Sequence, residues 1–580
     1  MRKLLLISAL LIFAFGFGQT PITDANFNQA IETCLSTNPI DGMCSDSEYG
    51  AMPDWDVSQV TNMSYAFNER FEFSGDISDW DVSSVTNMTN MFSGSRDAYT
   101  ATLTNFNSDI GDWDVSNVTD MMFMFYLSKF NRDIADWDVS SVTAMNYMFL
   151  DTSSFNQDIS NWDVSNVISM SGMFRNSVFN QPIGNWDVSN VTSMYKMFQN
   201  SVFNHPIGNW DVGNVLRMDY MFADSNFNQP IGNWDVSGVT IMSSMFSGAI
   251  SFNQDIMSWD ISNVTDMASI FNGAISFNQN MTFWDVVNVT NLSGMFANTS
   301  FNQDISSWDV SGATEMGGMF QNTPFNQDIS NWDVSSVTNM TNMFRSTPFN
   351  QDISNWDVGN VLTMDYMFAD SNFNQPIGNW DVSGVSSYWF PTENEYCCYD
   401  GMRYMFSNSP FNQDISDWDV SSVTAMSFMF QNTPFNQDIS NWDVGNVRMF
   451  GHMFENTPFN QDLSQWNIEN LGWIESDFLW GIFDNSGLNY EYYDNIITSW
   501  SQQNILNNAP EWINTGNYKT IGAEGVYYCN SEDARQVLIN NGWTLNDAGP
   551  NCKTDWIPEE GFLQDAGDTN THIWLEERDN

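Results

Sequence analysis

One aspartate recurs through this chain directly after a tryptophan, and its side chain is the clearest candidate for chemistry. The position is Asp in sixteen copies and Asn only at Asn467, so it needs an oxygen acceptor and tolerates an isostere. Two readings stay open. In one, the carboxylates form a solvated acidic face bonded to neighbouring Ser and Asn. In the other they form a cation-binding ladder, in which calcium would be the oxygen-seeking ion and Asp309, Asp333 and Asp357 the central run.

Catalysis would show as a residue that breaks the repetition, because an active site occurs once. The three histidines, His205, His452 and His572, lie far apart without metal-ligand spacing, and His205 fills a position where other copies have Gln. The sequence contains no P-loop, no dinucleotide-binding glycine motif and no nucleophile elbow. We therefore expect no enzyme, no catalytic residue and no cofactor beyond the calcium left open above.

A second candidate site is the segment 386–401, which is rich in aromatic residues. It interrupts a segment that we predict to be helical, so it should leave the array as a loop. Such a loop is either folded on itself under a Cys397–Cys398 constraint or made to touch a ligand, and both readings stay open. Its aromatic residues are Tyr388, Trp389, Phe390, Tyr396 and Tyr399.

These residues are positioned by a repeat that runs through most of the 580 residues. With tryptophan as the register mark there are seventeen copies, at steps of 24 or 25 residues except for two steps of 33 and 38. The longer steps indicate insertions near 93–105 and 386–401, and each unit of such an array packs on its neighbours. The register tryptophans are Trp55, Trp80, Trp113, Trp137, Trp162, Trp186, Trp210, Trp234, Trp259, Trp284, Trp308, Trp332, Trp356, Trp380, Trp418, Trp442 and Trp466.

The first half of each copy is predicted to be a short strand. Ile159, Trp162 and Val164 follow the apolar-x-x-apolar-x-apolar pattern of a leucine-rich-repeat strand, with Trp and Val in place of leucines. Stacked strands would form a parallel ribbon, the wide surface that such arrays use for binding. Because the aspartate lies between inward-facing Trp and Val, its side chain should face outward on that ribbon.

The second half of each copy is predicted to be a short helix. Ser165 stands where a helix N-cap belongs, and the spacing of the apolar residues that follow indicates one helical face. Asn180, in the next copy, is expected to satisfy backbone groups at the turn between coils. The residues of the predicted apolar face are Val167, Met170, Met173 and Phe174.

The first residues have the layout of a secretory signal peptide, 1–19, with basic Arg2 and Lys3 followed by an apolar run to Phe17. No second apolar stretch is long enough to cross a bilayer, so we expect no transmembrane segment. In an oxidising compartment the six cysteines should pair, although the sequence alone does not fix their connectivity.

The N-terminal end of the stack needs a cover, because the end face of an array is apolar. Residues 20–50 are expected to form this cap, with an amphipathic helix over 24–35 that begins at a capping Asp24. We expect a local disulfide between Cys34 and Cys44 to hold it. The repeat array itself is assigned to residues 51–470.

The C-terminal cap is assigned to residues 471–552, with one helix over 489–500 and a second helix capped by Ser531. A local disulfide between Cys529 and Cys552 is expected here. The remaining residues, 553–580, form an acidic tail.

Charge limits the partners. The chain has 71 acidic and 16 basic residues and a formal net charge of −55, which disfavours nucleic acid and anionic lipid. Its 25 Trp, 45 Phe and 35 Met are ample for a core, so the composition indicates an ordered protein.

The sequence of the repeat, for example FNQDISNWDVSSVTNMTNMF at residues 325–344, resembles the repeat sequence of the BspA-like leucine-rich-repeat surface proteins of bacteria. The resemblance covers about residues 50–470. The segment 528–549 is similar to one that closes such arrays in marine Bacteroidetes. The resemblance implies secretion or surface display, and adhesion to proteins or other cells.

Together these features predict an α/β solenoid: a leucine-rich-repeat-like stack of seventeen coils with a parallel β ribbon and short helices, capped at both ends. The expected function is that of a secreted or cell-surface protein that binds an extracellular protein or glycan. The alternative is a structural, cation-stiffened spacer or matrix protein without a specific ligand.

Overall fold

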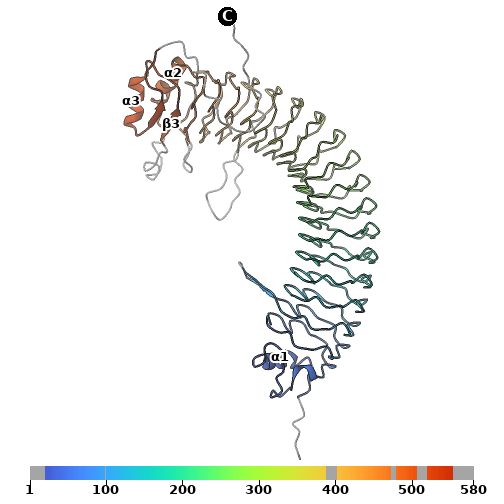
Figure 1. The fold of residues 1–580 in the computed structure, drawn as a ribbon. Coiled ribbons are helices and arrows are strands. Elements are labelled where there is room, and N and C mark those ends of the chain that lie inside the picture. The colour runs from blue at the N-terminus through green and yellow to red at the C-terminus, as the bar shows by residue number, and fades with distance from the viewer. Residues whose placement is uncertain (1–19, 98–99, 387–400, 472–477, 506–518, 553–580) are drawn as a thin grey trace, which may run out of the picture.

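A computed structural model describes residues 20–97, 100–386, 401–471, 478–505 and 519–552. The tandem repeats form coils that lie one on the next in a curved array (Figure 1). The predicted signal peptide and acidic tail lie outside the described residues. None of the described helices is both long enough and apolar enough to cross a membrane.

The apolar positions of the repeat form one continuous core, as the sequence predicts. Trp162 is 3% exposed, and Ile159 and Phe174 are fully buried. Each ring packs on the same residue of the next coil, so that the Trp162 and Trp186 centroids lie 6.5 Å apart at an interplanar angle of 3°. Since burial of a large apolar side chain contributes roughly 1.5–3 kcal/mol, every coil depends on its neighbours for stability.

The predicted strand at the tryptophan is absent from the described copies. Trp162 donates its backbone N–H to the Ile159 carbonyl at 3.2 Å, and Val167 donates to Val164 at 2.9 Å. These bonds close turns within one coil and use the donors that a ribbon would need. Isolated parallel bridges join successive coils further along, at the residue before the first methionine, as between Ser169 and its counterpart in the next coil.

The predicted short helix is also replaced by turns. Met170, Gly172 and Phe174 donate their N–H groups to carbonyls of the next coil, whereas the intervening Met173 donates to Met170 within its own coil. Gly172 and Asn176 have φ values of 60° and 53°, which no right-handed helix contains. The apolar spacing therefore arises from successive tight turns whose alternate N–H groups bond to the neighbouring coil.

The segment predicted to form the N-terminal cap contains α1 (Phe27–Leu35), which lies within the helix predicted over 24–35, followed by the short η1 (Met52–Asp54). Asp24 is not the helix cap. Its carboxylate accepts hydrogen bonds from the backbone N–H of Thr61 at 2.7 Å and from the Thr61 hydroxyl at 2.6 Å. Asp24 therefore fastens the cap to the first coil.

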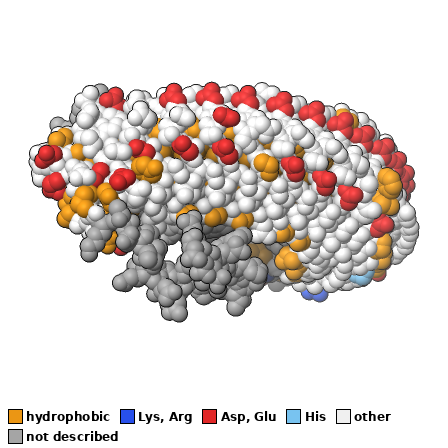
Figure 2. Space-filling view, turned by 90° about the horizontal axis from the view of Figure 1, so that it is seen from above, with side chains coloured by type: hydrophobic (Ala, Val, Ile, Leu, Met, Phe, Trp, Pro, Cys, Tyr) orange, Lys and Arg blue, Asp and Glu red, His pale blue; other side chains and the backbone are white. Residues whose placement is uncertain are grey.

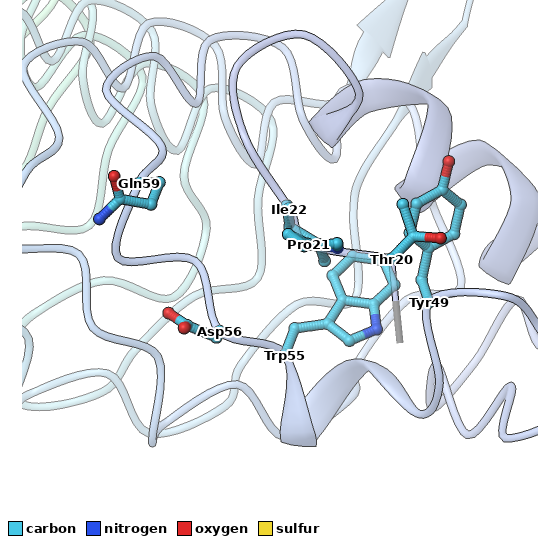
Figure 3. Close-up of a pocket in the computed structure, with 7 residues that line it drawn as sticks. All are labelled: Thr20, Pro21, Ile22, Tyr49, Trp55, Asp56 and Gln59. Atoms are coloured by element: carbon cyan, nitrogen blue, oxygen red, sulfur yellow. The ribbon is translucent and has the colours of Figure 1, made fainter. Parts of the chain in front are cut away.

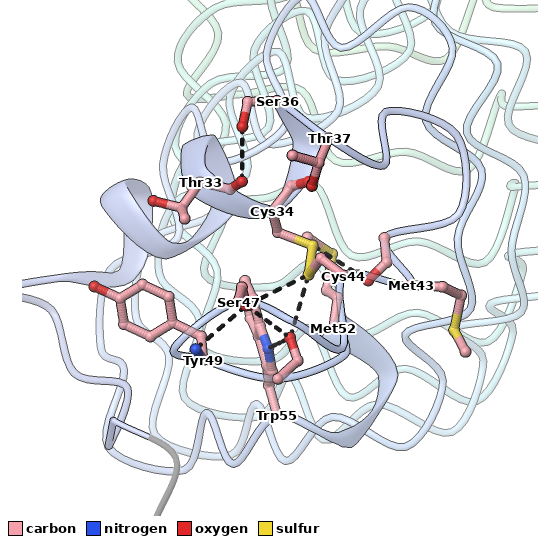
Figure 4. The surroundings of a disulfide bond; sticks show 12 residues. Thr33, Cys34, Ser36, Thr37, Met43, Cys44, Ser47, Tyr49, Met52 and Trp55 are labelled. Atoms are coloured by element: carbon pink, nitrogen blue, oxygen red, sulfur yellow. Dashed lines mark hydrogen bonds between the residues drawn. A yellow bond between two sulfur atoms is a disulfide. The ribbon is translucent and has the colours of Figure 1, made fainter. Parts of the chain in front are cut away.

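The predicted disulfide between Cys34 and Cys44 is present and ties α1 to the loop that follows it (Figure 4). Beside the disulfide, the Gly50 carbonyl accepts hydrogen bonds from the Trp55 indole at 3.1 Å and from the Ser47 hydroxyl at 3.2 Å. The cap is thus joined to the first register tryptophan.

The insertion near 93–105 forms an antiparallel hairpin of β1 (Ser95–Arg96) and β2 (Ala101–Thr102). It projects toward the inner side of the curved array, where it is drawn in blue (Figure 1). Arg96 pairs with Asp151 at 3.0 Å, which anchors the hairpin to a coil further along the array.

The C-terminal segment contains α2 (Tyr490–Trp500) and α3 (Glu532–Asn540), as predicted, and two strands that pair in parallel, β3 (Thr520–Ala523) and β4 (Thr544–Asp547). The Asn489 side chain caps α2.

The predicted disulfide between Cys529 and Cys552 is present. Ser531 makes no side-chain cap of α3. The carboxylate of Asp494 accepts instead from the backbone N–H groups of Cys529, Asn530 and Ser531 at 2.7–3.2 Å. A residue of α2 therefore fixes the start of α3.

Candidate binding surface

The aspartate after each tryptophan closes a turn. The Oδ1 atom of Asp163 accepts the backbone N–H of Ser165 at 3.1 Å, so Ser165 does not cap a helix. The Asn467 side chain accepts the backbone N–H of Glu469 in the same way, at 3.0 Å. The bond needs a side-chain oxygen at the first position and any backbone N–H two residues later. This explains why Asn replaces Asp and why the second position may be Gly.

The three aspartates of the predicted cation ladder are exposed on the coils. The hydroxyl and N–H of Ser311 hold the pKa of Asp309 below its usual value of 3.8, against repulsion from Asp333, and Ser335 lowers the pKa of Asp333. Within the described ranges, no group of three or more His, Cys, Asp or Glu is arranged to hold a metal ion. Calcium binding by this ladder, including Asp357, stays a prediction.

Acidic side chains run in rows along the face seen in Figure 2, whereas basic side chains show only near its lower edge. The surface that carries the negative charge is therefore a regular product of the repeat. Any exception to that charge pattern must come from positions that differ between copies.

The aromatic residues of the predicted ligand loop lie outside the described residues. The chain enters that loop after Ser386, whose N–H bonds to the Leu362 carbonyl at 3.1 Å. It returns at Gly401, whose N–H bonds to Asp365 at 3.0 Å. The residues not placed by the structure are Tyr388, Trp389, Phe390, Tyr396 and Tyr399.

His205 is confirmed as a variant of a repeat position. Its Nε2 lies 3.1 Å from the Asn180 carbonyl, the contact that Gln181 makes with the Asn156 carbonyl at 3.0 Å. The asparagine itself has the role expected of it, because the Asn156 side chain accepts the backbone N–H of Asn180 at 2.8 Å. These contacts are structural links between coils.

Among the positions that differ from copy to copy are four in the second half of each coil, whereas the core and most of the linking residues are nearly constant. These four positions correspond to residues 169, 171, 172 and 175 of one copy, and we call their side chains the variable band. Within it they contact one another, as in the Arg217–Asp219 pair at 2.9 Å. The motifs of the repeat consist of constant positions, so they did not predict this surface. Comparing the copies column by column would have found it.

The variable band lies on the inner side of the curve. The rings of Tyr404 and Phe428, in adjacent coils of the band, have centroids 4.3 Å apart, whereas Trp418 and Trp442 are 6.4 Å apart. Coils of a curved stack are closest along its inner edge. The β1–β2 hairpin projects to the same side (Figure 1).

An aromatic row occupies the C-terminal part of the band. Tyr366, Tyr404, Phe428 and His452 stack in that order, with ring centroids 4.4, 4.3 and 4.6 Å apart. All four are partly exposed. Arg345 lies with its guanidinium carbon 4.8 Å from the Tyr366 ring. The row begins beside the two ends of the 386–401 insertion.

A pocket of about 220 Å³ lies where the N-terminal segment meets the first coil (Figure 3). Tyr49 and Trp55 contribute rings to its wall, and Asp56 a carboxylate. The pocket is bordered by Thr20, where the described chain begins.

Comparison with known proteins identifies one family model, described as "Mycoplasma protein of unknown function, DUF285". It matches six tandem stretches, most of which overlap and which together cover more than half of the chain. The chain is therefore a repeat protein. No curated protein and no solved structure gives a match. The matched stretches are residues 40–129, 97–204, 127–226, 218–329, 292–394 and 399–482.

Proposed function

The chain belongs to the DUF285 family, and we propose that it is an exported repeat protein whose variable band binds an extracellular protein or glycan. The proposal rests on one observation, that each coil contains both constant positions and variable positions. The core, the asparagine links and the aspartate turns are constant, whereas the band changes its chemistry from coil to coil.

The aromatic row fits such a role. Partly exposed rings offer a large contact area and lose little side-chain entropy on binding, which is why Tyr and Arg are frequent in the centres of interfaces. The stacking of Tyr366, Tyr404 and Phe428 holds the rings in place before a ligand arrives. A preorganised surface keeps more of its contact energy as affinity.

We also propose that the array has seventeen coils and is a solenoid of the BspA-like leucine-rich-repeat kind. It also places the protein outside the cell or on its surface. The bonds between Cys34 and Cys44 and between Cys529 and Cys552 support export, because disulfides persist in oxidising compartments.

A structural spacer is the second candidate, and the aspartate turns favour it. The aspartates are the same in coils whose band residues differ, so every coil has the same acidic edge. A spacer would need no ligand, and cations could stiffen it by screening or binding the carboxylates.

A binding screen of the full chain against arrays of extracellular proteins and glycans tests the proposal. A variant with Tyr366→Ser and Tyr404→Ser should lose about tenfold or more in affinity for the ligand found. Phe283→Ser is the matched control, because Phe283 is a 76% exposed aromatic residue outside the band. Equal affinity of both variants, or no saturable ligand, would favour the spacer.

A further inference from the structure

The variable band carries a second group of residues, nearer the N-terminus, in which three cations lie among tyrosines. One cation comes from each of three successive coils, at different columns of the band. This concentration is unusual in a chain with 16 basic and 71 acidic residues. We call the group the tyrosine–cation patch, and it consists of Tyr147, Arg175, Tyr195, Lys196, Arg217 and Tyr220.

The rings and cations of the patch contact one another. The ammonium group of Lys196 lies 4.8 Å from the Tyr195 ring centroid and 4.9 Å from that of Tyr220. The Arg217 guanidinium carbon lies 5.0 Å from the Tyr195 centroid. Burial raises the pKa of Tyr147, and the charges of Arg175 and Arg217 act in the opposite direction, so these groups share one electrostatic environment.

Only one of the three cations is bonded to a carboxylate among the residues that the structure describes. Arg217 makes two hydrogen bonds to Asp219, which is 4% exposed. The Lys196 ammonium and the Arg175 guanidinium have no such partner in the described chain, and the Nε atom of Arg175 is buried without an acceptor. A buried donor without an acceptor costs free energy.

The charges of the patch therefore lack anions that this acidic chain could have supplied. Two positive charges, on Arg175 and Lys196, remain unmatched after the Arg217–Asp219 pair is formed. An anionic ligand would supply a counter-charge for Arg175 and Lys196 in a partly desolvated setting, where charge-assisted hydrogen bonds are strong.

The rest of the molecule limits what that ligand can be. With a net charge of −55, the surrounding surface repels a long polyanion, so the ligand should carry few anionic groups. The hydroxyls of Tyr147, Tyr195 and Tyr220 make no hydrogen bond to the described protein and can bond to a ligand that is rich in hydroxyl groups. Both features favour a sparsely charged sugar over an acidic peptide.

We propose that the tyrosine–cation patch binds the carboxylate or sulfate groups of an acidic oligosaccharide, with Arg175 and Lys196 as the anion-binding residues. The inference rests on the proposed function in so far as the patch is part of the variable band. It adds the chemical class of one ligand and the residues that recognise it.

Titration calorimetry of the full chain tests the proposal with four probes of similar length: an oligosaccharide with one uronate residue, an oligosaccharide with one sulfate group, a neutral oligosaccharide and an oligoglutamate. We expect one or both acidic saccharides to bind more tightly than the neutral one, and the affinity to fall with added salt. Arg175→Gln with Lys196→Gln should reduce that affinity about tenfold or more. Lys129→Gln with Arg132→Gln is the matched control, because these exposed cations contact Asn105 and Asn107 outside the band and should leave it unchanged.

Several outcomes would overturn the proposal. They are equal affinity for neutral and acidic saccharides, tighter binding of oligoglutamate than of either acidic saccharide, and unchanged affinity in the Arg175 and Lys196 variant. Absence of binding to every probe would also overturn it. The proposed function is tested separately, because a ligand that depends on Tyr366 and Tyr404 would stand even if the patch bound nothing.

Discussion

The indole Nε1 of Trp186 donates a hydrogen bond to the main-chain carbonyl of Ile159 in the preceding coil, over 3.1 Å. The same bond recurs along the array, for example from Trp332 to Ile305 at 3.2 Å. Tryptophan is therefore both a core residue and a link between coils. This explains why a large apolar residue without an N–H group, such as Phe or Leu, does not take its place.

Replacing Trp186 by Phe should lower the free energy of unfolding by about 1–3 kcal/mol, because the Ile159 carbonyl keeps only the Trp162 N–H of its two donors and the smaller ring leaves space in the core. Denaturant melts followed by circular dichroism measure the change. Trp480→Phe is the control, since that side chain is 41% exposed. Equal losses in the two variants would show that the indole bond contributes nothing.

Acid should unfold the protein through its aspartate turns. Serine hydrogen bonds lower the pKa of Asp309, Asp333 and Asp419 below 3.8, so the stability they contribute is present above that pH and is lost as the pH falls through the folded-state values. Burial raises the pKa of Asp484 and Asp547, which offsets part of the loss. The melting temperature should therefore drop steeply below about pH 4. A melting temperature that stays flat down to about pH 2.5 would contradict this.

The cation ladder predicts a calcium effect beyond screening. Millimolar calcium should raise the melting temperature more than sodium at equal ionic strength. Asp309→Asn with Asp333→Asn and Asp357→Asn should remove the calcium-specific increment while keeping the turn acceptors, as Asn467 does. Identical melting curves in the two salts would identify these carboxylates as a solvated acidic face.

The core and the cap helices could be predicted because they depend on local patterns. The burial of Ile159 and Trp162 follows from apolar spacing, and the disulfide between Cys34 and Cys44 follows from a short separation in an oxidising compartment. The linking role of Asn180 follows from the need to satisfy backbone groups at a fixed turn.

The path of each coil could not be predicted from apolar spacing alone. Met170 and Met173 are three residues apart, a spacing that fits a helix and a three-residue turn equally well. The choice depends on where the N–H groups bond, and here the next coil accepts that of Met170. A residue with positive φ, such as Lys196 at 56°, gives no apolar signal.

The variable band could not be predicted either, because its residues come together only in the folded array. Tyr404 and Phe428 become a surface only when the coils bring them together, and neither belongs to a motif. The sequence instead favoured the 386–401 loop, of which residues 387–400 lie outside the described residues. The variable columns were present in the sequence but carried no local pattern.

Deletion of one whole copy, residues 325–348, tests the central claim, that each copy is one coil whose neighbours can stack on each other in its absence. The deletion joins Pro324 to Phe349, which keeps the repeat in register, and the coils flanking the gap have the same core and linking residues. Melts followed by circular dichroism should show a cooperative protein with a melting temperature near that of the full chain. Deletion of residues 325–336 alone should lower it strongly, because half a coil cannot fill the stack. If both deletions unfold alike, the copies are not interchangeable coils of one array.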